Sequence, residues 1–345
     1  MQIHRCDCEK YCVEKRKGVV TGYWENFDSL LHQTVLPLTQ VPAAYTHVNI
    51  AFAQPDDTGR LFLAGRVPPA KAEILAMRAR GQQVLLSIGG AGAEVSLDTP
   101  EKVRVFSESL LGLIDSLGVG GIDIDVEKGM PATGTPCAPD GALAGLIQAL
   151  DYVLAQLSDT FELTFAPETV SLVGGMVRYS EDWGNYLPLI MHFANRLTRV
   201  HMQYYNSGPM RGLNGELVTP GTVDFLTALT ENVIEGFPIA NTGCEFPGLP
   251  PHKVAIGLTQ APQAAINGYM PPNLVNNALL ILMNGAPCYG YHPARQYTDL
   301  GGVMGWSVNF DADQNFMFVN TRSNFFCCCP PRRAVACPPR PCLPR

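Results

Sequence analysis

The stretch "GGIDIDVEKG", residues 120–129, alternates acidic and aliphatic side chains. Successive side chains of a β-strand point to opposite faces, so a strand here would place Asp123, Asp125 and Glu127 on one face. A row of carboxylates in an otherwise apolar segment indicates one face kept for chemistry and one kept for packing. The packing face would carry Ile122, Ile124 and Val126.

Segments of this kind recur along the chain. Short apolar runs alternate with longer amphipathic ones, in which apolar residues are spaced three and four apart. Eight strands alternating with helices over about 300 residues predict a single (β/α)8 TIM barrel, with a doubly wound open sheet as the alternative. The predicted strands are residues 18–27, 46–53, 83–90, 120–127, 162–169, 199–206, 253–260 and 302–310. The predicted helices are residues 69–80, 100–117, 141–157, 183–197, 223–236 and 272–284, with Thr99 and Asp140 as N-caps.

Polar and aromatic residues cluster at the C-terminal ends of these strands, and this favours the barrel over the open sheet. In a barrel all such ends meet at one mouth, where active sites are built, whereas an open sheet gathers only those at one crevice. The residues concerned are Tyr23, Trp24, Ser87, Glu127, Glu168, Gln203, Tyr205, Asn206, Gln260 and Trp306. We therefore expect the acidic strand to point its carboxylates into the barrel, toward this mouth.

The composition limits the kinds of partner. The chain has 345 residues, a net charge of −7, and 46% hydrophobic against 16% charged residues. There is ample material for a core, and there is no basic field to attract nucleic acid or an anionic membrane surface. No apolar run reaches the roughly 18–20 residues of a membrane span. The first residues contain no apolar core of a signal peptide.

The two ends of the chain differ in composition from the middle. We expect a poorly ordered leader over residues 1–17, the barrel over 18–325, and a disordered Pro-, Cys- and Arg-rich tail over 326–345. Most of the eleven cysteines lie in these ends, and because eleven is odd, at least one stays free or pairs between chains. The cysteines between the ends are Cys137, Cys244 and Cys288. A zinc cluster in the leader is disfavoured by its ligand spacing; the candidates are His4, Cys6, Cys8 and Cys12.

The neighbours of the acidic row at the predicted mouth indicate its chemistry. Aromatic rings can cover the apolar face of a pyranose, and acids and amides can hold its hydroxyls, so the residue types suggest a sugar. Like charges in a row push pKa values apart, which makes the outermost acid, Glu127, a natural proton donor. Two other interpretations stay open here: a solvated strand whose acids face water, and a divalent metal site built from the three acids.

The spacing of the acids bears on the type of glycosidase. A retaining enzyme with its own nucleophile needs a second carboxylate across the scissile bond, about 5–5.5 Å from the acid. Asp125 shares the strand and the side of Glu127, which is unsuited to attack from the opposite face of the ring. Gln203, Tyr205 and Asn206 offer hydrogen bonds and no nucleophile. The set suits a substrate that brings its own nucleophile, a 2-acetamido carbonyl, but spacing alone does not establish it.

The chain resembles glycoside hydrolase family 18, the chitinase family. Its "GGIDIDVE" (120–127) is similar to the DxxDxDxE signature of that family, with Gly120 at the first acidic position. Further motifs come in the order in which the family has them. They are "GYWENF" (22–27), "LLSIGG" (85–90), "LTFAPE" (163–168), "MQYYN" (202–206) and "GVMGWSVNFD" (302–311).

The resemblance implies a role for each acid. Glu127 would protonate the glycosidic oxygen and then act as a base toward water. Asp125 would bind the acetamido N–H and stabilise an oxazolinium intermediate, Asp123 would tune Asp125, and Tyr205 would hold the acetamido carbonyl. The implied substrate-binding residues are Gln203, Asn206, Trp306, Tyr23, Met202, Ala166 and Gly90. No metal and no cofactor is implied.

The expected function is that of an endo-acting chitinase, with chitin or chitooligosaccharides as partners. The end of the sixth strand resembles the branch of the family with a Gln-x-Tyr-Asn motif. The short segment between Gln260 and Pro272 leaves no room for the α+β domain that some relatives insert. The alternatives are an endo-β-N-acetylglucosaminidase acting on N-glycans and an inactive, lectin-like chitin binder. We expect a monomer that acts outside the cell.

Overall fold

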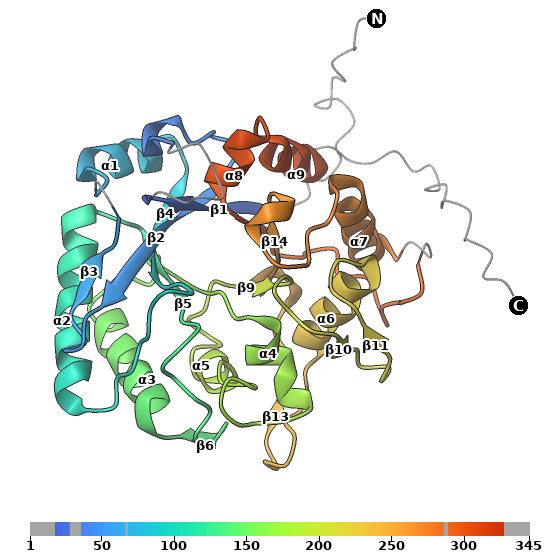
Figure 1. The fold of residues 1–345 in the computed structure, drawn as a ribbon, viewed down its shortest axis with the longest axis horizontal. Helices are drawn as coiled ribbons and strands as arrows, with labels where there is room; N and C mark the ends of the chain where they lie inside the picture. Colours follow the sequence, from blue (N-terminus) through green and yellow to red (C-terminus); the bar gives the residue numbers. More distant parts are fainter. Residues whose placement is uncertain (1–17, 28–35, 66–67, 286–288, 328–345) are drawn as a thin grey trace, which may run out of the picture.

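The computed structural model describes residues 18–27, 36–65, 68–285 and 289–327. Eight parallel strands form a barrel with helices around the outside (Figure 1). The strands are β1 (Val19–Glu25), β2 (His47–Pro55), β4 (Gln83–Gly89), β5 (Gly121–Asp125), β8 (Glu162–Phe165), β9 (Arg199–Gln203), β14 (Val254–Thr259) and β15 (Gly302–Trp306). Each lies within or across one of the eight predicted strands, and β3 (Leu61–Leu63) adds an antiparallel edge to β2.

The sheet closes on itself. Strand β1 pairs in parallel with β15 on one side and with β2 on the other, from Thr21 opposite His47 to Glu25 opposite Ala51. An open doubly wound sheet would leave two edges unpaired. The predicted (β/α)8 barrel is therefore confirmed.

All six predicted helices are present, at least in part. The helices are α1 (Lys71–Ala79), α2 (Pro100–Leu117), α3 (Gly141–Leu154), α4 (Thr169–Leu172), α5 (Leu187–His192), α6 (Val223–Glu235), α7 (Pro272–Asn284), α8 (Val308–Asp313) and α9 (Met317–Cys327). Short 3-10 helices are η2 (Leu38–Gln40), η3 (Val173–Met176), η4 (Pro251–Lys253) and η5 (Pro262–Ala264). Every helix predicted from periodicity contains an α-helix, but the extent of one differs.

The predicted helix over 183–197 is wrong in length, because only Leu187–His192 is helical. Gly184 has φ +77°, a left-handed conformation that a helix cannot contain, and the helix begins beyond it. The predicted strand over 302–310 likewise ends at Trp306. There the Ser307 side chain accepts a hydrogen bond from the Phe310 N–H and starts α8.

The acidic strand divides the interior as its alternation predicts. Ile122, Ile124 and Val126 are buried in the large apolar cluster between the barrel and its helices. That cluster also contains Phe106 of α2 and Leu146 of α3. The opposite face of β5 is left to the carboxylates. The solvated-strand interpretation placed the acidic side of β5 in water, but every residue of β5 is buried. That interpretation is therefore wrong.

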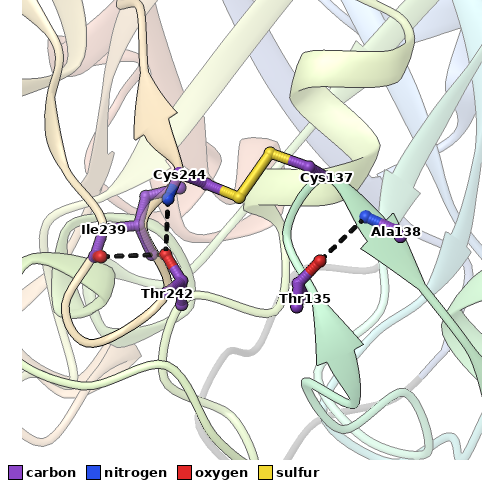
Figure 2. The surroundings of a disulfide bond; sticks show 6 residues. All are labelled: Thr135, Cys137, Ala138, Ile239, Thr242 and Cys244. Carbon is purple, nitrogen blue, oxygen red and sulfur yellow. Dashed lines mark hydrogen bonds between the residues drawn. A yellow bond between two sulfur atoms is a disulfide. The ribbon is translucent and has the colours of Figure 1, made fainter.

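Three small hairpins extend from the barrel. They are β6 (Gly134–Thr135) with β7 (Ala138–Pro139), β10 (Met210–Arg211) with β11 (Leu217–Val218), and β12 (Phe237–Pro238) with β13 (Glu245–Phe246). A disulfide between Cys137 and Cys244 joins the first hairpin to the third, with the Cα atoms 6.5 Å apart (Figure 2). Nothing in the sequence pattern predicted this pairing, which spans 107 positions.

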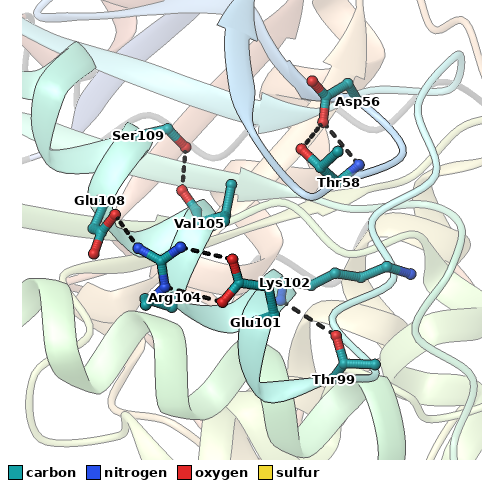
Figure 3. A network of polar contacts seen from close by, with 9 residues as sticks. All are labelled: Asp56, Thr58, Thr99, Glu101, Lys102, Arg104, Val105, Glu108 and Ser109. Carbon is teal, nitrogen blue, oxygen red and sulfur yellow. Dashed lines mark hydrogen bonds and ion pairs between the residues drawn. The ribbon is translucent and has the colours of Figure 1, made fainter.

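The start of α2 is held by side chains on its exposed face (Figure 3). Thr99 is the predicted N-cap, and its Oγ1 accepts a hydrogen bond from the Lys102 N–H at 3.3 Å. Arg104 forms ion pairs with Glu101 and Glu108, one turn away on either side. Asp140 does precede α3, but its side chain makes no capping hydrogen bond there.

The chain ends lie largely outside the described residues. The predicted leader (1–17) and residues 328–345 of the predicted tail are not among them, and neither are the candidate zinc ligands. Helix α9 continues to Cys327 and Phe326 is buried in the core, so the described residues include the first two positions of the predicted tail. No helix within the described ranges is long and apolar enough to cross a membrane.

The capping bond at α2 can be tested by stability. Replacing Thr99 with Ala leaves the Lys102 N–H without its acceptor, and we expect the free energy of unfolding to fall by about 1 kcal/mol. Guanidinium denaturation measures the change. Asp140→Ala is the matched control, since no capping bond is lost and a smaller decrease is expected. Equal losses in the two variants would contradict this account of the cap.

The disulfide can be tested in the same way. Cross-linking positions 107 residues apart restricts the unfolded chain, so removal of the bridge is expected to cost about 3–4 kcal/mol. Cys137→Ala, Cys244→Ala and the double variant should lose similar amounts, because each breaks the same bond. Wild-type protein treated with dithiothreitol should match them in melting temperature. Single variants as stable as the oxidised wild type would rule out a stabilising bridge.

Candidate active site

A cavity of about 460 Å³ opens at the C-terminal ends of the barrel strands. Its walls come from several strand ends and the loops that follow them, as expected for the mouth of a barrel. The lining residues are Phe27, Phe52, Gln54, Ala64, Gly65, Ala91, Gly92, Asp125, Glu127, Glu168, Gln203, Tyr205, Asn206, Ala264 and Trp306. Three carboxylates, three amides and several rings thus face one space.

Asp123 lies deepest in the acidic row and is fully buried. Three hydroxyl groups donate hydrogen bonds to its carboxylate: Tyr23 at 2.6 Å, Ser87 at 2.7 Å and Thr164 at 2.5 Å. Burial raises the pKa of Asp123, and the three donors oppose the rise because they favour the charged form. The donors come from three other strands, so they hold the carboxylate in one position.

Asp125 is one step closer to the mouth and is 4% exposed. The Gln203 side chain donates from Nε2 to Asp125 Oδ1 at 2.8 Å and to the Ala166 carbonyl oxygen at 2.8 Å. Because one amide nitrogen serves both acceptors, the orientation of the Gln203 side chain is fixed. The side-chain oxygen of Gln203, Oε1, then points away from Asp125.

The acids nearest the mouth hold their protons tightly. Burial raises the pKa of Asp125 well above its ordinary value, and the charges of Glu127, Asp123 and Glu168 raise it further. Burial, followed by the charge of Glu168, raises the pKa of Glu127 to about 7. A carboxylic acid with a pKa near 7 can give up a proton at neutral pH and take it back, which is what general acid–base catalysis needs.

Aromatic rings from β15, β1 and β2 form the cavity wall on the other side of the barrel from the acids of β5 and β8. Phe52 after the middle of β2 stacks on Trp306 at the end of β15, with ring centroids 5.7 Å apart and planes 16° apart. Tyr23 of β1 meets Trp306 edge-on at 5.7 Å. The peptide bonds Ala51–Phe52 and Trp306–Ser307 are cis. The exposed part of this wall is a flat apolar surface suited to a sugar ring.

The segment Tyr205–Asn206 is fastened to the loop after β14. The Ile266 N–H donates to Asn206 Oδ1 at 2.8 Å, and the Ser207 N–H donates to Asn267 Oδ1 at 3.2 Å. Asn206 itself has φ +50°, a conformation that asparagine tolerates better than most residues. The hydrogen bonds fix the backbone beside Tyr205, whose ring is 7% exposed at the cavity.

The predicted site residues fall into three groups. Six of them line the cavity: Asp125, Glu127, Gln203, Tyr205, Asn206 and Trp306. Asp123 and Tyr23 lie directly beneath, joined by their hydrogen bond. The remaining three are not part of the lining: Met202, Ala166 and Gly90.

These three residues lie behind the cavity lining, where they pack or form hydrogen bonds. Met202 is on the outward side of β9, in the apolar cluster that the helices cover. Ala166 offers its carbonyl oxygen to Gln203. Gly90 has φ +80°, and a Cβ there would come within 2.6 Å of the Phe52 ring, so only glycine lets that ring pack so closely.

Two side chains that line the cavity were not among the predicted site residues: Phe52 and Glu168. Phe52 was missed because strict alternation would turn it outward, but the register between β2 and β4 shifts between Ile50 and Ala53. This irregularity turns Phe52 to the cavity, and a shift of this kind leaves no mark in the hydrophobic pattern. Glu168 was recognised as an acid at a strand end but was not assigned to the site. Among the described residues, no group of three or more His, Cys, Asp or Glu side chains is arranged to hold a metal ion.

Acids graded from a buried floor to an open mouth, facing aromatic rings at the end of a TIM barrel, define the site of a glycoside hydrolase. The chain belongs to the glycosyl hydrolases family 18, whose sequence pattern matches residues 19–216. Chitinase Chi52 from Paenibacillus xylanexedens is 36% identical over 320 residues, 88% of this chain and 60% of that relative. The chain therefore spans about 60% of the length of Chi52.

Other relatives are matched over nearly their whole length. A probable class II chitinase of Arthroderma benhamiae is 34% identical over 312 residues, 84% of this chain and 94% of the relative. The crystal structure of a family GH18 chitinase from Chromobacterium violaceum superposes with a TM-score of 0.84 at 32% identity, covering 91% of this chain and 84% of that one.

The raised pKa of Glu127 predicts a pH-dependent cost in stability. Its folded-state pKa of about 7 exceeds the ordinary value of 4.5, so the folded protein holds a proton that the unfolded chain releases. The contribution of Glu127 to the free energy of unfolding should therefore fall by about 2–3 kcal/mol as pH rises from about 4.5 to 7. The glutamine in Glu127→Gln cannot ionise. The free energy of unfolding of this variant should therefore exceed that of wild type by about 2–3 kcal/mol at pH 7.5 and by almost nothing at pH 4.

Denaturant titrations at several pH values measure this difference. Glu108→Gln is the control, because Glu108 lies on the exposed face of α2 and the change should alter the pH dependence little. A Glu127→Gln variant whose stability relative to wild type is constant from pH 4 to 7.5 would show that Glu127 titrates at an ordinary pKa in the folded protein.

Proposed function

We propose that this protein is an endo-acting chitinase, which hydrolyses β-1,4 bonds between N-acetylglucosamine units with net retention. The observation that carries the proposal is the Asp125–Gln203 pair beside Glu127, facing Trp306 across one cavity. A carboxylate and an amide in fixed orientation suit the N–H and carbonyl of an acetamido group. A proton donor with a pKa of about 7 lies next to them.

The distribution of charge favours a nucleophile from the substrate. All acids that line the cavity, Asp125, Glu127 and Glu168, come from the ends of the neighbouring strands β5 and β8. Among the described residues, the wall contributed by β15, β1 and β2 presents rings and the Gln54 amide to the cavity and no carboxylate. No described carboxylate could attack the sugar from that side, and this favours attack by the acetamido oxygen of the substrate.

The reaction then has two steps. First, Glu127 donates its proton to the glycosidic oxygen, the bond from C1 to that oxygen breaks, and the acetamido carbonyl oxygen bonds to C1. Asp125 stabilises the positive oxazolinium ion from the N–H side, and Tyr205 steadies the carbonyl before attack. Second, the Glu127 carboxylate takes a proton from water, whose oxygen bonds to C1 as the oxazolinium ring opens. Two inversions at C1 give retention.

The relatives support chitin as the substrate class. The curated relatives and the superposed structure are themselves named chitinases. We also assign the chain to the branch with a Gln-x-Tyr-Asn motif and no inserted domain. Support comes from Gln203, Tyr205 and Asn206 at the cavity, and from the short segment 260–271 between β14 and α7.

The disulfide bond supports a proposal for the place of action. Disulfides form and persist in oxidising compartments, and the Cys137–Cys244 bridge joins two surface hairpins. This supports a protein that acts outside the cell, where chitin is found. We propose that it does so as a monomer, with chitin or chitooligosaccharides as its partners.

Glu127→Gln tests the assignment of the acid. The variant should bind chitooligosaccharide with near wild-type affinity but turn it over at least about a hundredfold more slowly, because the amide has no proton to donate. Calorimetric titration and reducing-end release measure the two quantities. Glu108→Gln on α2 should retain full activity. A fully active Glu127→Gln variant would mean that another group is the acid.

The substrate class is decided by comparing two compounds. Wild-type protein should cleave a chitooligosaccharide much faster than a high-mannose glycopeptide, and proton NMR should find the β-anomer released first. Faster cleavage of the glycopeptide would favour an endo-β-N-acetylglucosaminidase, and binding without cleavage of either would favour a lectin-like protein. Release of the α-anomer would exclude the substrate-assisted route.

A further inference from the structure

We propose that Glu168 is a positioning residue for the reaction, whose negative charge, in the same cavity as Glu127, opposes the loss of the Glu127 proton. Glu168 has no part in the steps described above. The inference rests on the proposed role of Glu127 as the acid, and it adds a group that shifts the pH range over which that acid works.

The barrel brings the two glutamates together. Strands β5 and β8 are neighbours, and the last residues in register are Ile124 and Phe165. Glu127 and Glu168 each lie three residues beyond that pair, where the Ala166 N–H still donates to the Ile124 carbonyl oxygen at 2.9 Å. The segments that follow β5 and β8 therefore leave the barrel side by side. The side chains of Glu127 and Glu168 line the same cavity.

The backbone of Glu168 is fixed while its carboxylate is left without a partner. Glu168 bridges to Gln203 of β9, whose N–H donates to the Pro167 carbonyl oxygen at 3.0 Å, and the Glu168 carbonyl oxygen accepts from the Ser171 N–H. Within the described part of the chain, the Glu168 side chain makes no hydrogen bond and no ion pair. A half-buried carboxylate without a structural partner acts on its surroundings mainly through its charge.

That charge falls on Glu127. After burial, the repulsion from Glu168 is the largest cause that raises the pKa of Glu127, and it also raises the pKa of Asp125. The ammonium group of Lys128 acts in the opposite sense. The Gln203 side chain also lowers this pKa, so Glu168 and Lys128 adjust, in opposite directions, a pKa that burial raises most. The titratable groups around this part of the site are Asp123, Asp125, Tyr186, Tyr205, Lys128, Glu168 and Asp182.

The sign of the effect on activity follows directly. Glu127 must carry its proton to act as the acid, so the alkaline limb of the pH profile of kcat/KM reports its ionisation. Removal of the neighbouring negative charge eases that ionisation and moves the limb to lower pH. Removal of the neighbouring positive charge moves it to higher pH.

The test is the pH profile of kcat/KM on a chitooligosaccharide for three variants. Glu168→Gln should shift the alkaline limb down by about one pH unit and retain activity near pH 5. Glu168→Asp keeps the charge and should leave the limb close to its wild-type place. Lys128→Met should shift the limb upward. Glu108→Gln on α2 is the distant control and should leave the whole profile unchanged.

A purely structural role gives a different result. If Glu168→Gln loses activity equally at every pH, with the limb in place, the inference is wrong. The titration of Glu127 followed by 13C NMR of its side-chain carboxyl provides a readout without turnover, and Glu168→Ala replaces the Gln variant if that one does not fold. Wild-type protein that cleaves no chitooligosaccharide would overturn the proposed function, while a Glu127 pKa lower in the Glu168 variant would still support the interaction.

Discussion

Three hydroxyl groups converge on one buried carboxylate, and the site is built above this point. Tyr23 of β1, Ser87 of β4 and Thr164 of β8 donate to Asp123 of β5, which water does not reach. A buried carboxylate costs several kcal/mol unless hydrogen bonds replace its water. The middle of this barrel is therefore polar where many TIM barrels stack branched aliphatic side chains, and four strands are held in one register by a single acid.

Above Asp123 the acids of this segment become gradually more exposed toward the mouth, but both still hold their protons more tightly than usual. Burial raises the pKa of Asp125, and the charges of Glu127, Asp123 and Glu168 raise it further; burial and the charge of Glu168 raise the pKa of Glu127. Within the described ranges, Gln203 and Lys128 act against this rise. Keeping these carboxylic acids buried makes the folded protein less stable at neutral pH. The same raised pKa values make Glu127 a proton donor.

The parts of the structure that follow local periodicity could be predicted from the sequence. Alternation in β5 gave the two faces of that strand, and the polar strand ends gave the mouth and six of its lining residues. Departures from periodicity could not be predicted. The shift in β2 that brings Phe52 to the cavity, and the left-handed Gly184 that shortens α5, depend on how neighbouring segments pack.

Contacts between distant positions are the other part that a single sequence hides. The pairing of Cys137 with Cys244 depends on two hairpins meeting after the barrel has closed. Glu168 is a related case, since its position at a strand end was evident but its effect was not. That effect depends on β5 and β8 being neighbours and on a carboxylate that has no hydrogen bond or ion pair with any described residue. The sequence shows neither condition, yet next to Glu127 the charge of such a carboxylate is the property that matters.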